Sequence, residues 1–281
     1  MSPFPMKFAG HTMGTPGVDV FRAIDIVAEA GMDGIEFRSA ADGVIHEASF
    51  TPELGAKVLD HAKAAGLEVC SVCPYYQDYI GAREATVAGV KLAIDMAEAL
   101  ACPVVRISGG REQNEGLTAD QARGVLADAL KQVGDYAADH GVTGAIETHV
   151  GTLCYTSAQT LDVIERTAHP AIRVCLDWAF IAQAGQDTVE SCFERLAPHI
   201  VHVHAKDFAG RGPDDKVGRQ AILGEGDLGW PEVIAQLVAI GYEGYLSDEY
   251  EKHWKRELPE PTDWFPRSRA AMARLVADAA L

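Results

Sequence analysis

Residues 144–178 read GAIETHVGTLCYTSAQTLDVIERTAHPAIRVCLDW, and they contain one complete strand–helix–strand unit. The short apolar run at residues 144–149 predicts a strand, and residues 157–167 have the length and polarity of an amphipathic helix. Residues 173–178 predict the next strand. Two strands that are joined through a helix run parallel in one sheet, with a right-handed crossover. The stretch therefore predicts an α/β protein.

The same alternation runs through the whole chain. Apolar runs predict strands at residues 6–11, 34–39, 67–73, 104–108, 144–149, 173–178, 200–206 and 244–249. Amphipathic patterns predict helices at residues 18–30, 51–66, 84–100, 118–139, 157–167, 188–196, 230–240 and 266–280. A parallel sheet of eight such units closes into a barrel, and a barrel of this kind occupies about 250 residues. We therefore predict a single (β/α)8 TIM barrel, one domain spanning residues 1–281.

An open, doubly wound sheet is the alternative that this alternation allows. The version that binds dinucleotides carries a G-x-G-x-x-G turn after its first strand. No such motif follows residues 6–11. Hydrophobic residues make up 48% of the chain, which is enough for a sizeable packed core. The closed barrel is the preferred prediction.

Charge and hydropathy exclude several classes of partner. Lys and Arg number 24 and Asp and Glu number 41, so the formal net charge is −17. A chain this acidic repels a phosphate backbone, so we expect no nucleic-acid partner. No apolar run reaches the roughly 18 residues needed to cross a membrane, and the first residues lack the pattern of a signal peptide. We expect a cytoplasmic protein without a membrane partner.

The cysteines do not form a disulfide framework, which is typical of small secreted chains. Cys70 and Cys73 make a C-x-x-C, but both lie within the strand expected at residues 67–73. Side chains three positions apart on a strand point to opposite faces. We therefore expect reduced, buried cysteines rather than a zinc or redox pair.

Ionisable residues end four consecutive strands of the predicted barrel. They are Glu147, Asp177, His204 and Glu249. Catalytic groups of a TIM barrel lie at the carboxyl ends of its strands, so these side chains are expected to meet at one rim. Three carboxylates would repel one another strongly without a cation. Three oxygen donors and one imidazole suit a divalent ion, Mn²⁺ first, with Mg²⁺, Co²⁺, Zn²⁺ or Fe²⁺ as alternatives.

Other side chains are expected at the same rim as substrate contacts: His11, Glu36, Arg106, His149, Trp178, Lys206 and Trp254. His202 shares a strand face with His204 but lies deeper, so we expect a hydrogen-bonded core histidine there. Residues 250–265 include His253, Trp254 and Trp264. Their aromatic rings could stack on a sugar or an aryl group as a lid. Packing against the last helix or a neighbouring subunit is the alternative.

The chain resembles the sugar phosphate isomerase/epimerase family, which has a xylose isomerase-like TIM barrel and includes the ketose 3-epimerases. The resemblance rests on the four strand-end residues, on HVHAKD at residues 202–207 and on GEGDLGW at residues 224–230. It extends from GMDGIE at residues 31–36 to the last strand. It implies a metal held by Glu147, Asp177, His204 and Glu249, and a homo-oligomer, either a dimer or a tetramer.

The resemblance also implies an activity. The glutamates that match Glu147 and Glu249 exchange a proton next to the carbonyl of a ketose or a related polyhydroxy-carbonyl substrate. We therefore expect a metal-dependent isomerase or epimerase. The 3-epimerases carry a histidine where this chain has Phe180, and Arg211 is the nearest counterpart of an arginine that follows their strand-seven histidine.

These departures keep a second reaction class open. A metal-dependent lyase or dehydratase would use the same proton abstraction, in the manner of inosose dehydratase, dehydroshikimate dehydratase or C-glycoside-cleaving enzymes. Lys206 or His149 would then serve as the acid that helps the leaving group depart. An alternative of another class is a non-catalytic carbohydrate-binding barrel or subunit.

Overall fold

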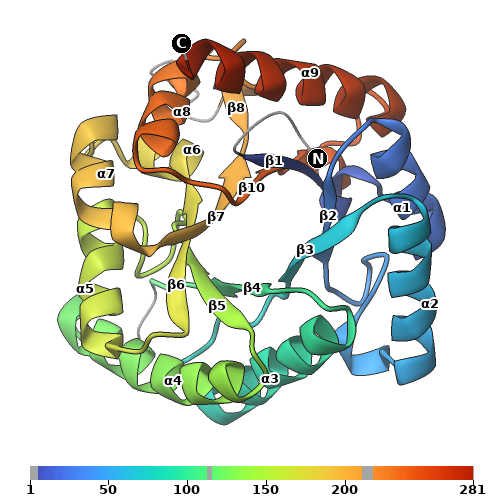
Figure 1. Cartoon of the computed structure of the whole chain (residues 1–281). Coiled ribbons are helices and arrows are strands. Elements are labelled where there is room, and N and C mark those ends of the chain that lie inside the picture. Colours follow the sequence, from blue (N-terminus) through green and yellow to red (C-terminus); the bar gives the residue numbers. More distant parts are fainter. Residues whose placement is uncertain (1–5, 113–115, 211–217, 281) are drawn as a thin grey trace.

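The parallel strands close into a barrel in the order β1-β10-β7-β6-β5-β4-β3-β2 (Figure 1). The computed structural model describes residues 6–112, 116–210 and 218–280, and Arg211 lies outside them. The barrel strands are β1 Lys7–His11, β2 Gly34–Arg38, β3 Glu68–Cys73, β4 Val104–Ser108, β5 Thr143–Glu147, β6 Ile172–Asp177, β7 Ile200–Ala205 and β10 Tyr245–Asp248. The predicted TIM barrel is confirmed, and the open sheet was the wrong alternative.

Helices surround the barrel as an outer ring, as Figure 1 shows. Those that follow the predicted pattern are α1 Val20–Glu29, α2 Pro52–Ala64, α3 Arg83–Ala99, α4 Ala119–Asp139, α5 Ser157–Thr167, α7 Val189–Leu196, α8 Trp230–Ala239 and α9 Pro261–Ala279. Local sequence explains several starts. Thr118 and Gln121 form a reciprocal capping box at the start of α4, and Thr51 caps α2 with Pro52 in its first turn.

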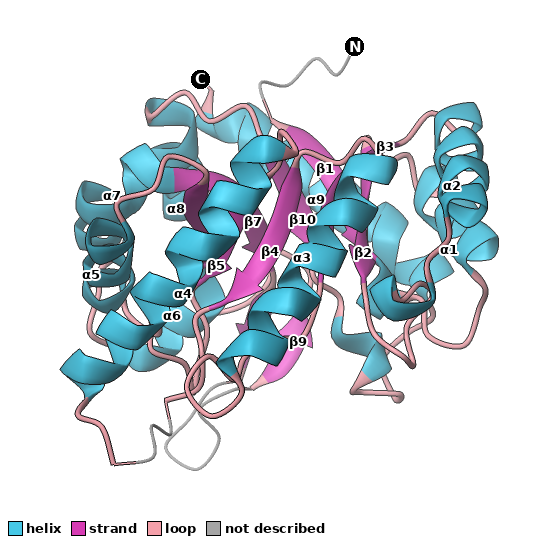
Figure 2. Ribbon diagram, turned by 90° about the horizontal axis from the view of Figure 1, so that it is seen from below, coloured by secondary structure: helices cyan, strands magenta, loops and turns pink. Residues whose placement is uncertain are grey.

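Three local features differ from the prediction. Residues 173–178 were expected to be strand, but the short helix α6 begins at Trp178 and runs to Ala184, with Asp177 as its N-cap. The last helix begins at Pro261 rather than at Pro266, because a proline in the first turn lacks only an N–H that would have no partner there. A hairpin of β8 Asp207–Ala209 and β9 Arg219–Ala221 follows β7. In Figure 2, which shows the barrel from the side, β9 lies at one end of it.

The barrel interior has a small apolar base below a charged layer. Val104, Ala145 and Cys175 form a cluster of their own, separate from the large core between the strands and the helices. Inner-face residues alternate along a strand, so the next inward positions on β4 and β5 are Arg106 and Glu147, and both are buried. This charged layer occupies space that apolar side chains usually fill in such barrels.

The structure also bears on the cysteines and on the length and polarity of the helices. All six cysteines are buried and unpaired: Cys70, Cys73, Cys102, Cys154, Cys175 and Cys192. This agrees with the interpretation of the C-x-x-C as structural. Among the described residues, no helix combines the length and the apolar character that a membrane crossing requires.

Asp207 organises the connection between β8 and α8. Its carboxylate accepts hydrogen bonds from the backbone N–H groups of Phe208, Gly224, Gly226 and Leu228, at 2.9, 2.9, 3.0 and 3.3 Å. A Cβ atom at Gly226 would lie 2.2 Å from Oδ1 of Asp207, so this close approach requires glycine. The GEGDLGW motif is therefore built around one carboxylate.

We expect Asp207→Ala to lower the free energy of unfolding by about 2–4 kcal/mol, because several backbone donors lose a charged acceptor. Urea denaturation of the two proteins measures this difference. Asp60→Ala, at an exposed position of α2, is the matched control and should change stability by less than about 0.5 kcal/mol. An Asp207→Ala protein as stable as this control would contradict the structural role of the carboxylate.

Candidate functional site

The four predicted metal ligands come together at the carboxyl ends of their strands. Glu147, Asp177, His204 and Glu249 are all buried, and their nearest ligand atoms lie within 4.8 Å of one another. Glu147 and Asp177 end β5 and β6, and Glu249 directly follows β10. Parallel strands of a barrel deliver their carboxyl ends to one rim, which explains why residues so far apart in sequence meet.

The electrostatics of this cluster fit a divalent cation. Burial raises the pKa of Asp177 to about 7, and the neighbouring Glu249 and Glu147 add to the rise while Lys206 opposes it. In the described part of the chain, Oε2 of Glu147 and Oδ2 of Asp177 accept no well-formed hydrogen bond. They lie instead in ion pairs with Arg106 at 2.5 Å and Lys206 at 2.7 Å. Hard oxygen donors with excess negative charge are the set that Mn²⁺ or Mg²⁺ prefers.

Glu36 holds His204 in a fixed orientation. Oε1 of Glu36 lies 3.1 Å from Nε2 of His204, and Oε2 lies 2.9 Å from Nε2 of His202. A carboxylate that accepts from Nε2 leaves Nδ1 of His204 as the nitrogen available to a cation. Nδ1 faces Glu147 at 2.8 Å and Glu249 at 3.5 Å. The prediction that His202 is a hydrogen-bonded core histidine is confirmed.

His11, Glu36 and His204 form a second cluster of possible ligands, but His11 is poorly suited to bind a metal. Its Nδ1 accepts the backbone N–H of Met13 at 3.0 Å, and burial lowers its pKa to about 4. The neutral ring therefore carries its hydrogen on Nε2, which lies 4.0 Å from Glu36. A nitrogen that carries hydrogen offers no lone pair to a cation.

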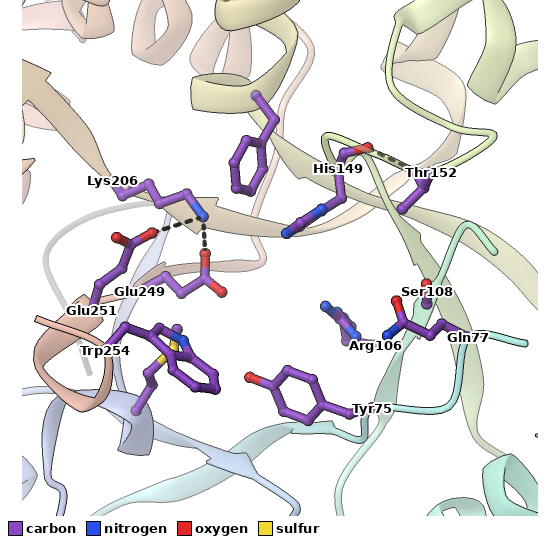
Figure 3. A pocket seen from close by; sticks show the side chains of 12 residues that line it. Tyr75, Gln77, Arg106, Ser108, His149, Thr152, Lys206, Glu249, Glu251 and Trp254 are labelled. Carbon is purple, nitrogen blue, oxygen red and sulfur yellow. Dashed lines mark hydrogen bonds and ion pairs between the residues drawn. The ribbon is translucent and has the colours of Figure 1, made fainter. Parts of the chain in front are cut away.

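A cavity of about 290 Å³ lies beside Glu249, one of the four predicted ligands (Figure 3). It is lined by Met13, Tyr75, Gln77, Arg106, Ser108, His149, Thr152, Phe180, Lys206, Glu249, Glu251 and Trp254. Four of the predicted substrate contacts are thus on its wall: Arg106, His149, Lys206 and Trp254. The other three lie elsewhere. Glu36 is bonded to His204, His11 lies 4.0 Å from Glu36, and Trp178 is buried in α6, where its indole N–H donates to the carbonyl of Leu228 at 2.7 Å.

Lys206 and His149 face the cavity with opposite hydrogen-bonding roles. Burial opposes a charge on Lys206, but the surrounding carboxylates raise its pKa well above the ordinary value. Its Nζ lies 2.5 Å from Glu249 and 4.0 Å from the centre of the Phe180 ring. Nδ1 of His149 lies 2.6 Å from the carbonyl of Val150, so the hydrogen is on Nδ1 and Nε2 is an acceptor. The ring points into the cavity in Figure 3. Lys206 is therefore a donor and Nε2 of His149 an acceptor in this structure, and a role of either residue as an acid stays a prediction.

The segment at residues 250–265 places its two tryptophans differently. Trp254 is 58% exposed and lines the cavity. Trp264 belongs to α9, stacks on Tyr250 with ring centres 4.2 Å apart, and donates to Asp248 at 3.0 Å. Trp264 therefore packs in the core, and only Trp254 is positioned to contact a ligand. A lid movement of this segment stays a prediction.

Several residues that line the cavity were not predicted from the sequence. Tyr75, Gln77 and Thr152 lie in loops just beyond the ends of β3 and β5, and Glu251 begins a short 3-10 helix, Glu251–His253, after β10. Hydrophobic periodicity locates strands and helices, and it carries no information about which loop side chains turn inward. The pair Tyr75–Tyr76 after Pro74 was the one compositional signal available at these positions.

Comparison with known proteins places most of the barrel in a family. A family model described as a xylose isomerase-like TIM barrel matches residues 24–275. An inosose dehydratase of Mesomycoplasma hyopneumoniae (strain 7448) is 26% identical over 147 residues, or 48% of this chain and 49% of the relative. A 3-dehydroshikimate dehydratase of Bacillus anthracis is 24% identical over 187 residues, or 66% and 65%. The chain thus matches about half to two thirds of the length of these curated relatives.

Solved structures show the same fold at low sequence identity. A probable 3-DHS dehydratase from Bacillus anthracis aligns with a TM-score of 0.77 at 20% identity, over 95% of this chain and 99% of that one. An L-ribulose 3-epimerase aligns with a TM-score of 0.76 at 23% identity, over 98% and 96%. Identities this low establish the shared fold alone.

We expect Glu36→Gln to weaken Mn²⁺ binding by about 10–100-fold, because an amide holds His204 less firmly than a carboxylate does. Isothermal titration of metal-free protein with MnCl₂ measures the affinity. Glu84→Gln, at an exposed position of α3, is the control and should bind Mn²⁺ like the parent protein. Equal affinities of a folded Glu36→Gln protein and the parent would show that Glu36 does not support the site.

Proposed function

The chain belongs to the xylose isomerase-like TIM barrel family, and from this we propose that it is a metal-dependent sugar isomerase or epimerase. One observation carries the proposal: two buried glutamates, Glu147 and Glu249, both approach Nδ1 of His204 beside a cavity. Inversion at a carbon next to a carbonyl requires two bases on opposite faces of the substrate. A divalent ion, Mn²⁺ first, bound by Glu147, Asp177, His204 and Glu249 would polarise that carbonyl and acidify the neighbouring C–H bond.

The proposed proton transfer depends on both glutamates being ionised at neutral pH. Burial works to raise the pKa of each carboxyl group, but nearby cations lower it overall. Arg106 lies 2.5 Å from Glu147, and Lys206 lies 2.5 Å from Glu249. One carboxylate removes the proton from carbon and later releases it to water, and the other glutamate, after taking up a proton from water, delivers that proton to the opposite face.

The cavity suits a small polyhydroxylated substrate. Its volume of about 290 Å³ corresponds to roughly ten water molecules, which is room for a compound of monosaccharide size. Gln77, Ser108 and Thr152 offer hydrogen-bonding groups, and the exposed ring of Trp254 offers a flat face for a sugar. We propose a homo-oligomeric enzyme, a dimer or a tetramer, on the strength of the family resemblance.

A lyase or dehydratase is the second candidate, and two observations favour it. Lys206 places an ammonium group in the cavity beside Glu249, where it could protonate a departing hydroxyl group. Phe180 lines the cavity at the position where the 3-epimerases carry a histidine. In this reaction a carboxylate removes the proton from carbon, the C–O bond breaks, and the hydroxyl leaves as water after protonation by Lys206. The curated relatives named as dehydratases support this candidate, and the intact ligand set speaks against a non-catalytic barrel.

Reaction in deuterated water separates the candidates. The Mn²⁺-loaded protein would be incubated with ketoses, inososes, 3-dehydroshikimate and 3-oxo-glycosides, and the products followed by NMR. We expect deuterium at the carbon next to the carbonyl of a ketose, without loss of water. Loss of water or of an aglycone would favour the lyase, and turnover of no compound, with binding, would favour the non-catalytic barrel.

Glu147→Gln and Glu249→Gln should each lower kcat by about 10²–10⁴-fold, because an amide cannot accept the substrate proton. Steady-state rates on the active compound, at saturating Mn²⁺, measure this effect. Glu84→Gln is again the control and should leave kcat unchanged. Full turnover by either site variant would refute the assignment of the two bases.

A further inference from the structure

The hairpin of β8 and β9 lies between Lys206 and Glu249: it begins directly after Lys206, and Gln220 in β9 is bonded to the backbone of Glu249. Strand β8 begins at Asp207, directly after Lys206, and pairs antiparallel with β9, so that Phe208 is opposite Gln220. Asp207 in turn binds the backbone of the segment that leads to α8. The hairpin is therefore anchored on the Lys206 side of the cavity. A plain strand–helix barrel does not require this hairpin between β7 and α8.

Gln220 reaches from the hairpin to the chain that carries the two cavity glutamates. Its Nε2 donates to the carbonyl oxygen of Glu249 at 3.0 Å, and its Oε1 accepts the backbone N–H of Glu251 at 3.0 Å. The side chain is buried, with 4% of the residue exposed. These two bonds use both ends of one amide group, so they fix its orientation and hold the backbone on both sides of Tyr250.

From this geometry we propose that Gln220 is a positioning residue that sets Glu249 and Glu251 relative to Lys206; the inference rests on the proposed function of Glu249. The side chains of Glu249 and Glu251 both lie close to the ammonium group of Lys206. Nζ of Lys206 lies 2.5 Å from Glu249 and 3.8 Å from Glu251 (Figure 3). The backbone N–H of Glu249 donates to the carbonyl of Ala205 in β7 at 3.2 Å, and Gln220 supplies the hydrogen bond to the carbonyl oxygen of Glu249.

The position of the Glu249 carboxylate matters for the proposed chemistry. In the proposed function Glu249 binds a metal and transfers a proton, and both the affinity and the rate depend on where its carboxylate lies. A displacement of about 1 Å can cost about 100-fold in rate. Gln220 does not belong to the lining of the cavity, and its two side-chain hydrogen bonds go to the backbone of Glu249 and Glu251, so it would act through that backbone.

The test compares Gln220→Met, which keeps the volume and removes both hydrogen bonds, with Asp227→Asn. Asp227 accepts the N–H of Gly210 at 2.7 Å in the same region and does not line the cavity, so it controls for a general loosening of the loop. We expect Gln220→Met to weaken Mn²⁺ binding about tenfold by titration calorimetry. On the active compound, kcat should fall about tenfold or more with KM within twofold of the parent. Amide exchange in residues 249–254 should become faster.

Asp227→Asn should leave all three measurements within twofold of the parent, and Gln220→Glu, which keeps the acceptor for Glu251, should give intermediate values. A folded Gln220→Met protein with parental Mn²⁺ affinity and kcat would overturn the proposal. So would equal effects of Asp227→Asn, or the failure of both Gln220 variants to fold. If the parent itself binds no Mn²⁺, the proposed metal site fails, while the exchange of residues 249–254 still decides whether Gln220 holds that segment.

Discussion

The structure depends on a buried ionic network inside the barrel. Glu147 is bound on one oxygen by Arg106 and on the other by His204, and Glu36 holds His204 from the opposite side. Removing such charges from water is costly, and the cost is offset only where every group has a partner. The network links β2, β4, β5 and β7, so the barrel cannot shift one of these strands without breaking an ion pair in its interior.

This network explains why the site is both charged and rigid. The same space in a purely structural barrel would hold layers of branched apolar side chains. Here the apolar base is limited to small residues such as Val104, Ala145 and Cys175, and the layer above is ionic. Against the effect of burial, Arg106 lowers the pKa of Glu147 and Lys206 lowers that of Glu249, and Glu249 lines the cavity. The proposed proton transfer next to a carbonyl requires an ionised base of this kind beside the substrate.

Around this fixed centre, the loops provide what distinguishes one substrate from another. Phe180 lies against His149 with ring centres 4.1 Å apart and the ring planes tilted by 50°, and the Phe180 ring also lies beneath Lys206. Tyr75, Gln77 and Trp254 form another part of the wall. Loop side chains of a barrel vary without disturbing the strands, so one fold can serve epimerases and dehydratases alike. In the proposed function, groups such as Lys206 and Phe180, rather than the four proposed metal ligands, would decide between these reactions.

The sequence by itself determined the barrel and the four strand-end residues. Strand and helix periodicity is a local property, and eight repeats of it leave few arrangements of a parallel sheet. Glu147, Asp177, His204 and Glu249 were visible because an ionisable residue at the end of an apolar strand has no reason to be in a core. Only the tertiary structure decided that Glu36 orients His204, that Trp178 turns away into α6, and that Gln220 holds the chain at Glu249. These are contacts between residues 29 to 168 positions apart in the sequence, and the directions of their side chains are set by packing. No local pattern records such directions, because they exist only once the strands are assembled.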